Sequence, residues 1–196
     1  QYDTDYIIQS AESSIKALKC DYLDAFLLHR PSPLMDPEAI AKAAEHLQSQ
    51  GKVIDFGVSN FTPSQTDLIQ KTTKVTINQI EASLTHLDPF FDGSLDHMLT
   101  NNIRPMSWRP LGHVFKDKTE QTHRIHALLG ALCEHYGASK DQLLLAWLLH
   151  HPAGIIPVVG TTTKERMSAA AGAAKINLSQ MHWFQLLVAS QGHKVP

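Results

Sequence analysis

Leu27-Leu28-His29-Arg30-Pro31 is the stretch of sequence that decides the fold. It is an apolar, strand-like run that ends in polar side chains. The same pattern returns in Gly57-Val58-Ser59-Asn60-Phe61 and in Asn78-Gln79-Ile80-Glu81. A (β/α) barrel builds its binding site from polar groups at the ends of successive parallel strands. The three stretches therefore predict neighbouring strands whose polar ends, with His29 the first, face one shared ligand.

Short apolar runs alternate with helix-period segments along the whole chain. The expected strands lie at about residues 23–28, 53–58, 75–80, 103–108 and 155–159, and the expected helices at 6–18, 37–50, 62–71, 93–101, 122–136, 140–150, 163–174 and 179–190. Thr4 and Asp5 are the cap candidates of the first helix, whereas Asp36-Pro37 opens the second. Strands that alternate with helices indicate parallel pairing with right-handed crossovers.

Five strands are compatible with an open sheet as well as with a barrel. The absence of nucleotide-binding motifs helps to choose between these two folds. A doubly wound nucleotide-binding domain carries a GxGxxG fingerprint after its first strand, and neither that motif nor a P-loop occurs here. No linker, repeat or low-complexity segment divides the 196 residues, of which 43% are hydrophobic. We therefore expect one α/β domain over residues 1–196, a partial (β/α)8 TIM barrel of about five parallel strands with flanking helices.

Composition excludes several classes of function. The 17 Lys and Arg residues nearly balance 19 Asp and Glu residues without a basic run, so no nucleic-acid or membrane-surface binding is expected. No apolar stretch reaches the ~20 residues of a membrane span, and the polar amino-terminal stretch does not resemble a signal peptide, which predicts a cytoplasmic protein. Cys20 and Cys133 are too isolated for a disulfide framework and are expected to be reduced and semi-buried.

Twelve histidines raise the question of a metal site, which the spacing does not favour. His123 and His126 are three residues apart, and His150 and His151 are adjacent. Neither pair comes with an HExxH pattern or a cysteine partner. We predict no metal site.

One further stretch suits an anion. IPVVGTTTKERM, residues 156–167, joins a strand to a helix start, whose free amides and dipole favour negative charge. Gly160 permits close backbone approach, Thr161 and Thr162 offer hydroxyls, and Arg166 can donate a forked pair of hydrogen bonds to a phosphate.

Five motifs in this order resemble the aldo-keto reductase family. DYLDAFLLHRP resembles its fourth strand, GVSNF its fifth, NQIEASL its sixth, SWRPLG its seventh, and IPVVGTTTKERM its eighth strand with the cofactor-binding helix that follows. LLHRPSPLM also resembles the YdhF-like branch of that family. The likeness runs from about Asp5 to the end of the chain. It implies strands four to eight of the barrel, with the part that precedes them missing.

The resemblance implies an oxidoreductase that reduces a small-molecule aldehyde or ketone to an alcohol with NADP(H). His29 takes the position of the catalytic histidine. The implied cofactor-binding residues are Ser59, Asn60 and Gln79 at the carboxamide, Trp108 stacked on the nicotinamide, Arg109, Pro110 and Leu111 beyond it, and Gly160, Thr161, Thr162 and Arg166 at the 2′-phosphate, with Lys164 assisting.

The chain departs from the family pattern in three places. The family's acid is a tyrosine activated by a lysine and an aspartate, all upstream of the histidine strand, and none has a counterpart here, so this chain alone is expected to be inactive. Ala169 and Ala170 stand where the family often has an acidic residue or an amide near the adenine. Gly112-His113-Val114 replaces a glycine-rich run.

Other interpretations stay open at this point. Taken singly, His29 is a polar strand end, Ser59 and Asn60 a helix cap, Trp108 a core residue and Arg166 a solvated helix residue. The chain could also be a non-catalytic nucleotide-binding or interaction module, or another barrel enzyme that binds a phosphorylated metabolite at residues 160–162. Five strands leave two open sheet edges, through which self-association is expected.

Overall fold

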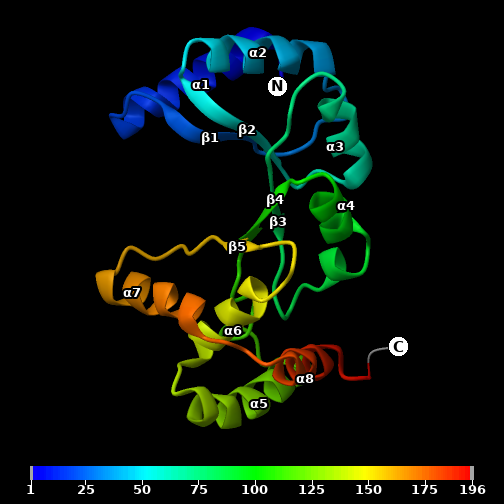
Figure 1. Cartoon of the computed structure of the whole chain (residues 1–196), viewed down its shortest axis with the longest axis vertical. Helices are drawn as coiled ribbons and strands as arrows, with labels where there is room; N and C mark the ends of the chain where they lie inside the picture. The colour runs from blue at the N-terminus through cyan, green and yellow to red at the C-terminus, as the bar shows by residue number, and fades with distance from the viewer. Residues whose placement is uncertain (1, 195–196) are drawn as a thin grey trace. The chain divides into compact units, whose positions relative to one another are not determined.

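Strands and helices alternate along the chain as the sequence pattern predicts (Figure 1). The computed structural model describes residues 2–194. Their strands are β1 (Leu23–Leu28), β2 (Val53–Ser59), β3 (Ile77–Glu81), β4 (Arg104–Trp108) and β5 (Ile156–Pro157). Their helices are α1 (Thr4–Leu18), α2 (Pro37–Ser49), α3 (Pro63–Gln70), α4 (Ser94–Thr100), α5 (Glu120–Tyr136), α6 (Lys140–Leu149), α7 (Lys164–Gly172) and α8 (Gln180–Gln191), with 3₁₀ turns η1 (Asp88–Phe90) and η2 (Ala173–Lys175). None of these described helices combines the length and apolar character needed to cross a bilayer.

The sheet has the order β1-β2-β3-β4-β5, so strands that follow one another in sequence are neighbours in space. The pairs β1–β2, β2–β3 and β4–β5 are parallel. The register sets Leu28 opposite Val58 and Ser59 opposite Gln79. Parallel strands end at the same edge of a sheet, and the polar residues after β1, β2 and β3 therefore follow one another along one edge.

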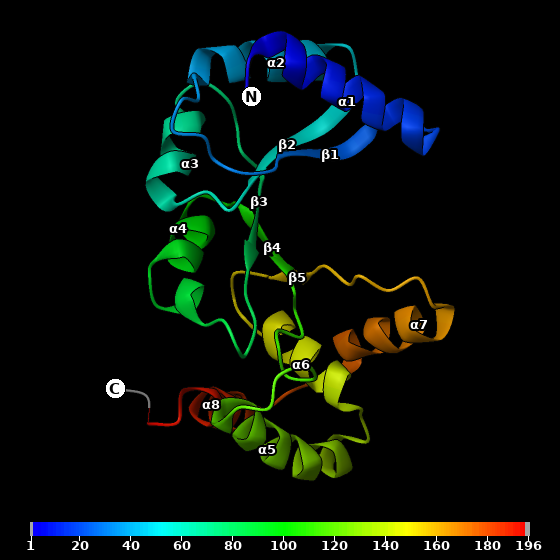
Figure 2. The ribbon, with the colours of Figure 1, turned by 180° about the vertical axis from the view of Figure 1, so that it is seen from behind.

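The chain divides into two compact units, the first made of the residues up to Ile80 with Asp96–Pro105, and the second of Glu81–Leu95 with the residues from Met106 onward. In the first unit, α1 and α2 lie side by side against β1 and β2 (Figures 1 and 2). Helix α2 buries Ile40, Ala43, Ala44 and Leu47, the i, i+3, i+4, i+7 stripe of an amphipathic helix. Phe56 of β2 is likewise fully buried.

The second unit has its core around α6. Its residues 143–148 are all buried, because neighbouring elements surround the helix. Trp147 stacks on Trp183 of α8 with ring centroids 4.8 Å apart. Each indole N–H donates to the other residue's backbone carbonyl, at 3.1 and 2.9 Å. Helices α5 and α8 also lie side by side (Figures 1 and 2).

Several local predictions need correction. Asp3, and neither Thr4 nor Asp5, caps α1, because its carboxylate accepts a hydrogen bond from the Tyr6 amide at 2.9 Å. Strand β5 spans two residues instead of the five expected, since the chain leaves the ladder once the Val158 amide has bonded to Ser107. Cys20 is exposed, although a semi-buried thiol was expected. The single domain expected over the whole chain stays a prediction.

Candidate functional site

Hydrogen bonds join Ser59, Asn60 and the backbone of Gln79 at the carboxyl ends of β2 and β3. The Ser59 hydroxyl donates to the Gln79 carbonyl at 2.8 Å, and the Asn60 backbone amide donates to the same oxygen at 2.8 Å. The Asn60 side-chain amide donates to the Ser59 hydroxyl at 3.1 Å. Ser59 is buried and Gln79 is half-buried, so both are held within the sheet edge. These hydrogen bonds bring Ser59, Asn60 and the Gln79 backbone together, and their predicted role in cofactor binding stays a prediction.

Asn60 adopts a backbone conformation that few residues tolerate. Its φ is +61°, in the left-handed region where asparagine is one of the accepted non-glycine residues. Its side-chain amide also approaches the His29 carbonyl, at 3.4 Å. Asn60 thereby links the strand ends of β1, β2 and β3. The helix cap that follows is made by Thr62 and Gln65, which leaves Ser59 and Asn60 outside it.

His29 stands directly after β1 and is exposed. It lines a cavity of about 250 Å³, together with Tyr2, Tyr6 and Ser10 and with the end of β1. The Tyr2 hydroxyl donates to the Arg30 carbonyl and accepts from the Arg30 amide at 3.0 Å. One phenol therefore lies close to the candidate histidine, with its hydroxyl engaged by the backbone.

Asn78 is a functional candidate that motif reasoning did not single out. Its side chain is 2% exposed, and its amide donates to the Phe61 carbonyl at 2.9 Å. This bond ties β3 to the segment after Ser59 and Asn60, so Asn78 positions that segment. A polar residue at a buried position of an alternating strand is the signal that could have identified it.

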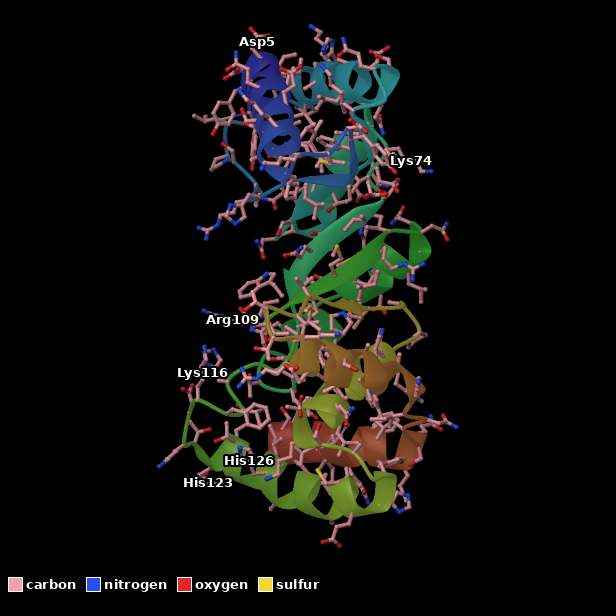
Figure 3. All side chains as sticks on the ribbon, turned by 90° about the vertical axis from the view of Figure 1, so that its left-hand side faces the viewer. Asp5, Lys74, Arg109, Lys116, His123 and His126 are labelled. Carbon is pink, nitrogen blue, oxygen red and sulfur yellow. The ribbon has the colours of Figure 1, made fainter. Side chains whose placement is uncertain are left out.

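A second group of candidates follows β4, in the second unit. The Arg109 guanidinium carbon lies 5.4 Å from the centre of the Trp108 ring, and one guanidinium nitrogen lies 3.8 Å from the Glu81 carboxylate. The Arg109 side chain projects from the end of the strand (Figure 3). Pro110 is buried and Leu111 is half-buried. Of the predicted cofactor residues in this stretch, Trp108 and Arg109 thus contact each other.

The turn after Arg109 is fixed by the segment that follows β3. The Gly112 amide donates to the Arg109 carbonyl at 2.7 Å, and the His113 amide donates to the Thr85 hydroxyl at 2.9 Å. Gly112 has φ +54°, and a Cβ there would lie 2.1 Å from the Thr85 hydroxyl and 2.6 Å from that of Ser83. The turn therefore needs glycine at this position.

The predicted phosphate site leads from β5 into α7. Gly160 is exposed, and a Cβ there would meet no atom within 4 Å. The Thr161 hydroxyl accepts from the Thr163 amide at 3.2 Å, which shapes the approach to the helix. Within the described residues no side-chain hydrogen bond caps α7 at Thr163, and Arg166 is exposed in its first turn. An anion can therefore reach the first amides of the helix, and Arg166 belongs to the same turn.

The structure gives non-metal partners for His126, one of the histidines considered as metal ligands. Over residues 2–194 no three side chains of His, Cys, Asp or Glu come close enough to bind one metal ion together. His126 hydrogen-bonds through Nε2 to the Val114 carbonyl at 2.7 Å, and its Nδ1 lies 3.4 Å from the Lys140 ammonium. Burial raises the pKa of the Cys133 thiol, which disfavours the reactive thiolate form.

Comparisons with known proteins agree with the motif order. Residues 1–187 match the model of the Aldo/keto reductase family. The uncharacterized oxidoreductase YcsN of Bacillus subtilis is 42% identical over 97% of this chain and 65% of its own length. Oxidoreductase YdhF of Escherichia coli is 40% identical over 99% of the chain and 66% of its own length. The 6-dehydroglucose reductase of Agrobacterium fabrum is 37% identical over 99% of this chain and 66% of its own length. The chain thus spans about two thirds of the length of these relatives.

Solved structures give the same result for the fold. The thermostable aldo-keto reductase Tm1743 aligns with a TM-score of 0.84 at 26% identity, over 96% of this chain and 67% of that one. The aldo/keto reductase of Klebsiella pneumoniae, solved with NADP and acetate, aligns with a TM-score of 0.82 at 26% identity. The alignment covers 96% of this chain and 65% of that one. The five strands and eight helices therefore match about two thirds of an aldo-keto reductase barrel.

Proposed function

Since the chain belongs to the aldo/keto reductase family, we propose that it supplies the histidine and most of the cofactor site of an oxidoreductase that reduces aldehydes or ketones with NADP(H). The observation that carries the proposal is the hydrogen-bonded arrangement of the Ser59 hydroxyl, the Asn60 side-chain amide and the Gln79 backbone carbonyl at adjacent strand ends. Donors and acceptors fixed before a ligand arrives cost little further ordering when it binds.

The nicotinamide end fits these residues. Bound NADPH would supply the hydride. The amide of Asn60 and the side chain of Gln79 offer the donors and acceptors that a carboxamide needs, with Ser59 anchoring Asn60. Trp108 offers an aromatic ring for stacking. Arg109, Pro110 and Leu111 remain proposed contacts further along the cofactor.

The phosphate end fits as well. The open space at Gly160, the hydroxyls of Thr161 and Thr162, and the uncapped start of α7 suit a phosphate group. Arg166 adds a cation that can form two parallel hydrogen bonds to phosphate oxygens. This arrangement favours NADP(H) over NAD(H), because only the former carries the 2′-phosphate. The neighbouring Glu165 carboxylate lies in the same first turn and opposes this preference in part.

His29 is proposed to act on the carbonyl oxygen. Negative charge develops on that oxygen as a carbonyl is reduced, and an imidazole N–H at the strand end can donate a hydrogen bond to it. The proton itself requires an acid. The tyrosine implied by the resemblance has no counterpart here, and the Tyr2 hydroxyl is engaged by Arg30. We therefore propose that the whole protein catalyses reduction, whereas this chain by itself binds the cofactor.

Binding is the first test. We expect NADPH to quench the tryptophan fluorescence of the purified chain, and Arg166→Ala to weaken NADPH binding by about tenfold while leaving NADH binding unchanged. Arg104→Ala, at an exposed arginine at the start of β4, is the matched control. Equal losses for both variants, or no NADPH binding at all, would count against the proposed phosphate site.

Turnover is the second test. NADPH oxidation is measured with methylglyoxal and with 6-dehydroglucose, the compounds in the names of relatives of this chain. We expect no turnover by the chain alone, and turnover that falls at least tenfold in His29→Ala once the chain is extended to the length of its relatives. An extended protein that binds NADPH yet reduces no carbonyl would favour a non-catalytic nucleotide-binding module.

A further inference from the structure

Asn78 of β3 carries a buried amide of which only one half has a partner. Its Nδ2 donates to the Phe61 carbonyl at 2.9 Å, whereas its Oδ1, which is also buried, accepts no hydrogen bond from residues 2–194. The opposite orientation of the amide would set Oδ1 against the carbonyl oxygen of Phe61, so the bond to Phe61 fixes the orientation. A buried acceptor without a donor destabilises the fold. An asparagine that weakens the core at its oxygen therefore calls for a role at its nitrogen.

The bond to Phe61 ends on the far side of a turn that follows β2. Strand β2 ends at Ser59, and Asn60 then turns the chain with φ +61°. The near side of this turn is held by the Gln79 carbonyl, which accepts from the Ser59 hydroxyl and from the Asn60 backbone amide, both at 2.8 Å. Asn78 and Gln79, successive residues of β3, thus hold the chain after and before Asn60. Every residue of this arrangement belongs to the first unit.

The conformation of Asn60 needs this support. A left-handed φ is less favourable than the ordinary helical or extended region for a residue with a side chain, although asparagine tolerates it better than most. The Asn60 side-chain amide donates to the Ser59 hydroxyl at 3.1 Å and approaches the His29 carbonyl at 3.4 Å. A change of φ would move this amide relative to both groups. Its place at the strand ends therefore depends on the backbone that Asn78 and Gln79 hold.

We propose that Asn78 is a positioning residue, which clamps the Phe61 carbonyl, keeps Asn60 in its left-handed turn and thereby holds the Asn60 side-chain amide in place for the carboxamide of a nicotinamide. The carboxamide part of this inference rests on the proposed function, whereas the clamp on the turn stands on the hydrogen bonds alone. Because Asn78 is buried, it acts on the ligand only through Asn60.

The first experiment reads the turn without any cofactor. Hydrogen exchange of the Asn60 backbone amide is followed by nuclear magnetic resonance in the native protein and in Asn78→Leu, which is similar in size and cannot donate. We expect this amide to exchange about tenfold faster in Asn78→Leu, relative to the ladder amides of β1 and β2. Thr66→Val is the matched control, because the buried Thr66 hydroxyl likewise donates to a backbone carbonyl, that of Thr62, at 2.9 Å. The control should leave the exchange at Asn60 unchanged.

Two outcomes decide this first experiment. Faster exchange at Asn60 in Asn78→Leu alone supports the clamp. Equal exchange in the native protein and in Asn78→Leu, or an equal acceleration in Thr66→Val, overturns it. If Asn78→Leu does not fold, Asn78→Thr takes its place, because threonine suits a strand and its side chain is shorter than that of asparagine.

The second experiment tests whether Asn78 acts through Asn60. NADPH is titrated into the native protein, Asn78→Leu, Asn60→Gly and the double variant. Glycine adopts the left-handed turn without a clamp and lacks the amide. We expect Asn78→Leu to weaken NADPH binding about fivefold and to cause no further loss in the Asn60→Gly background, whereas Thr66→Val keeps the native affinity. A further loss in that background, or an unchanged affinity in Asn78→Leu, contradicts the positioning role.

Together the two experiments separate this inference from the proposed function. A native protein that binds no NADPH refutes the cofactor site and the carboxamide part of the inference, while faster exchange at Asn60 in Asn78→Leu would still support the clamp. Native NADPH binding that Asn78→Leu leaves unchanged refutes the positioning role, and the proposed function then stands without it.

Discussion

At residue 112 the backbone and its neighbours together require glycine. Gly112 has φ +54°, and an added Cβ would overlap the hydroxyls of Thr85 and Ser83. Both hydroxyls are hydrogen-bonded, so they cannot turn away without losing partners. We expect Gly112→Ala to lower the free energy of unfolding by about 2–3 kcal/mol, measured by urea denaturation.

Gly130 provides the matched control at the residue scale. It lies inside α5, is exposed, and a Cβ there would meet no atom within 4 Å. Because glycine is a poor helix former, Gly130→Ala should raise the free energy of unfolding by up to about 1 kcal/mol. Equal effects of the two substitutions would show that the turn at Gly112 does not constrain the chain.

The residue types of the candidate site follow from the sequence, but their local geometry does not. Motif order identifies Ser59, Asn60 and Gln79, and the parallel register then brings them together. The left-handed conformations of Asn60 and Arg109 are not predictable from motif order, because distant backbone and side-chain partners impose them. The contact between Glu81 and Arg109 joins the ends of two separate strands, and the local sequence pattern of neither strand predicts it.

At the scale of elements, one tyrosine hydroxyl joins the end of α5 to the start of α8. The Tyr136 hydroxyl lies 2.7 Å from Nδ1 of His182 and accepts from the Ser179 amide at 3.0 Å, at the start of α8. Tyr136→Phe removes the shared partner of the half-buried His182 ring and of the Ser179 amide. We expect a loss of about 1–2 kcal/mol in the free energy of unfolding, by urea denaturation. Tyr22→Phe, at a tyrosine that is 46% exposed, should change little; a comparable loss there would argue against the α5–α8 role.

The packing of α1 beside β2 includes an ion pair that predicts a pH effect. Lys52 donates to Glu12 at 2.6 Å, and this ammonium lowers the pKa of Glu12 below its ordinary value of 4.5. The stabilisation is full above pH 4.5 and is lost as the pH falls through the lowered folded pKa. Glu12→Gln should therefore lower the thermal midpoint slightly at neutral pH and not in strong acid.

Glu134→Gln, which removes an exposed carboxylate of α5, is the control for that comparison. It should leave the thermal midpoint unchanged at both pH values. If Glu12→Gln lowered the thermal midpoint by the same amount in acid as at neutral pH, the loss would not come from the charge of Glu12.

The starts of helices were predicted well where a capping residue in the local sequence marks them. The capping residues Asp36 and Thr62 stand at the starts of α2 and α3, as expected for Asp and Thr before a proline. The shortness of β5, which was expected to span residues 155–159, and the turn η1 were not predicted, because ladder length and 3₁₀ turns depend on the neighbours that the chain meets after folding. Local patterns thus determine where elements start more reliably than where a strand leaves its sheet.

At the scale of the whole molecule, the alternation of strands and helices was enough to predict parallel pairing. It could not distinguish an open sheet from part of a barrel. That distinction came from the motif order and agrees with the likeness to solved barrels. The relevant information lies in residues at strand ends, and these contribute little to any helix or strand pattern.

The sheet order also leaves two edges, from which the last prediction follows. Among the described strands β1 pairs only with β2 and β5 only with β4. Unpaired strand edges expose backbone donors and acceptors that can pair with another chain. Ile156 of β5 is 43% exposed and adds apolar surface there. We therefore expect the 21.8 kDa chain to associate as its concentration rises, and Ile156→Lys to weaken that association, both measured by sedimentation velocity. Leu34→Lys, at a side chain that is 93% exposed outside the strands, controls for added charge. A chain that stays monomeric at about 100 μM would show that its edges are protected.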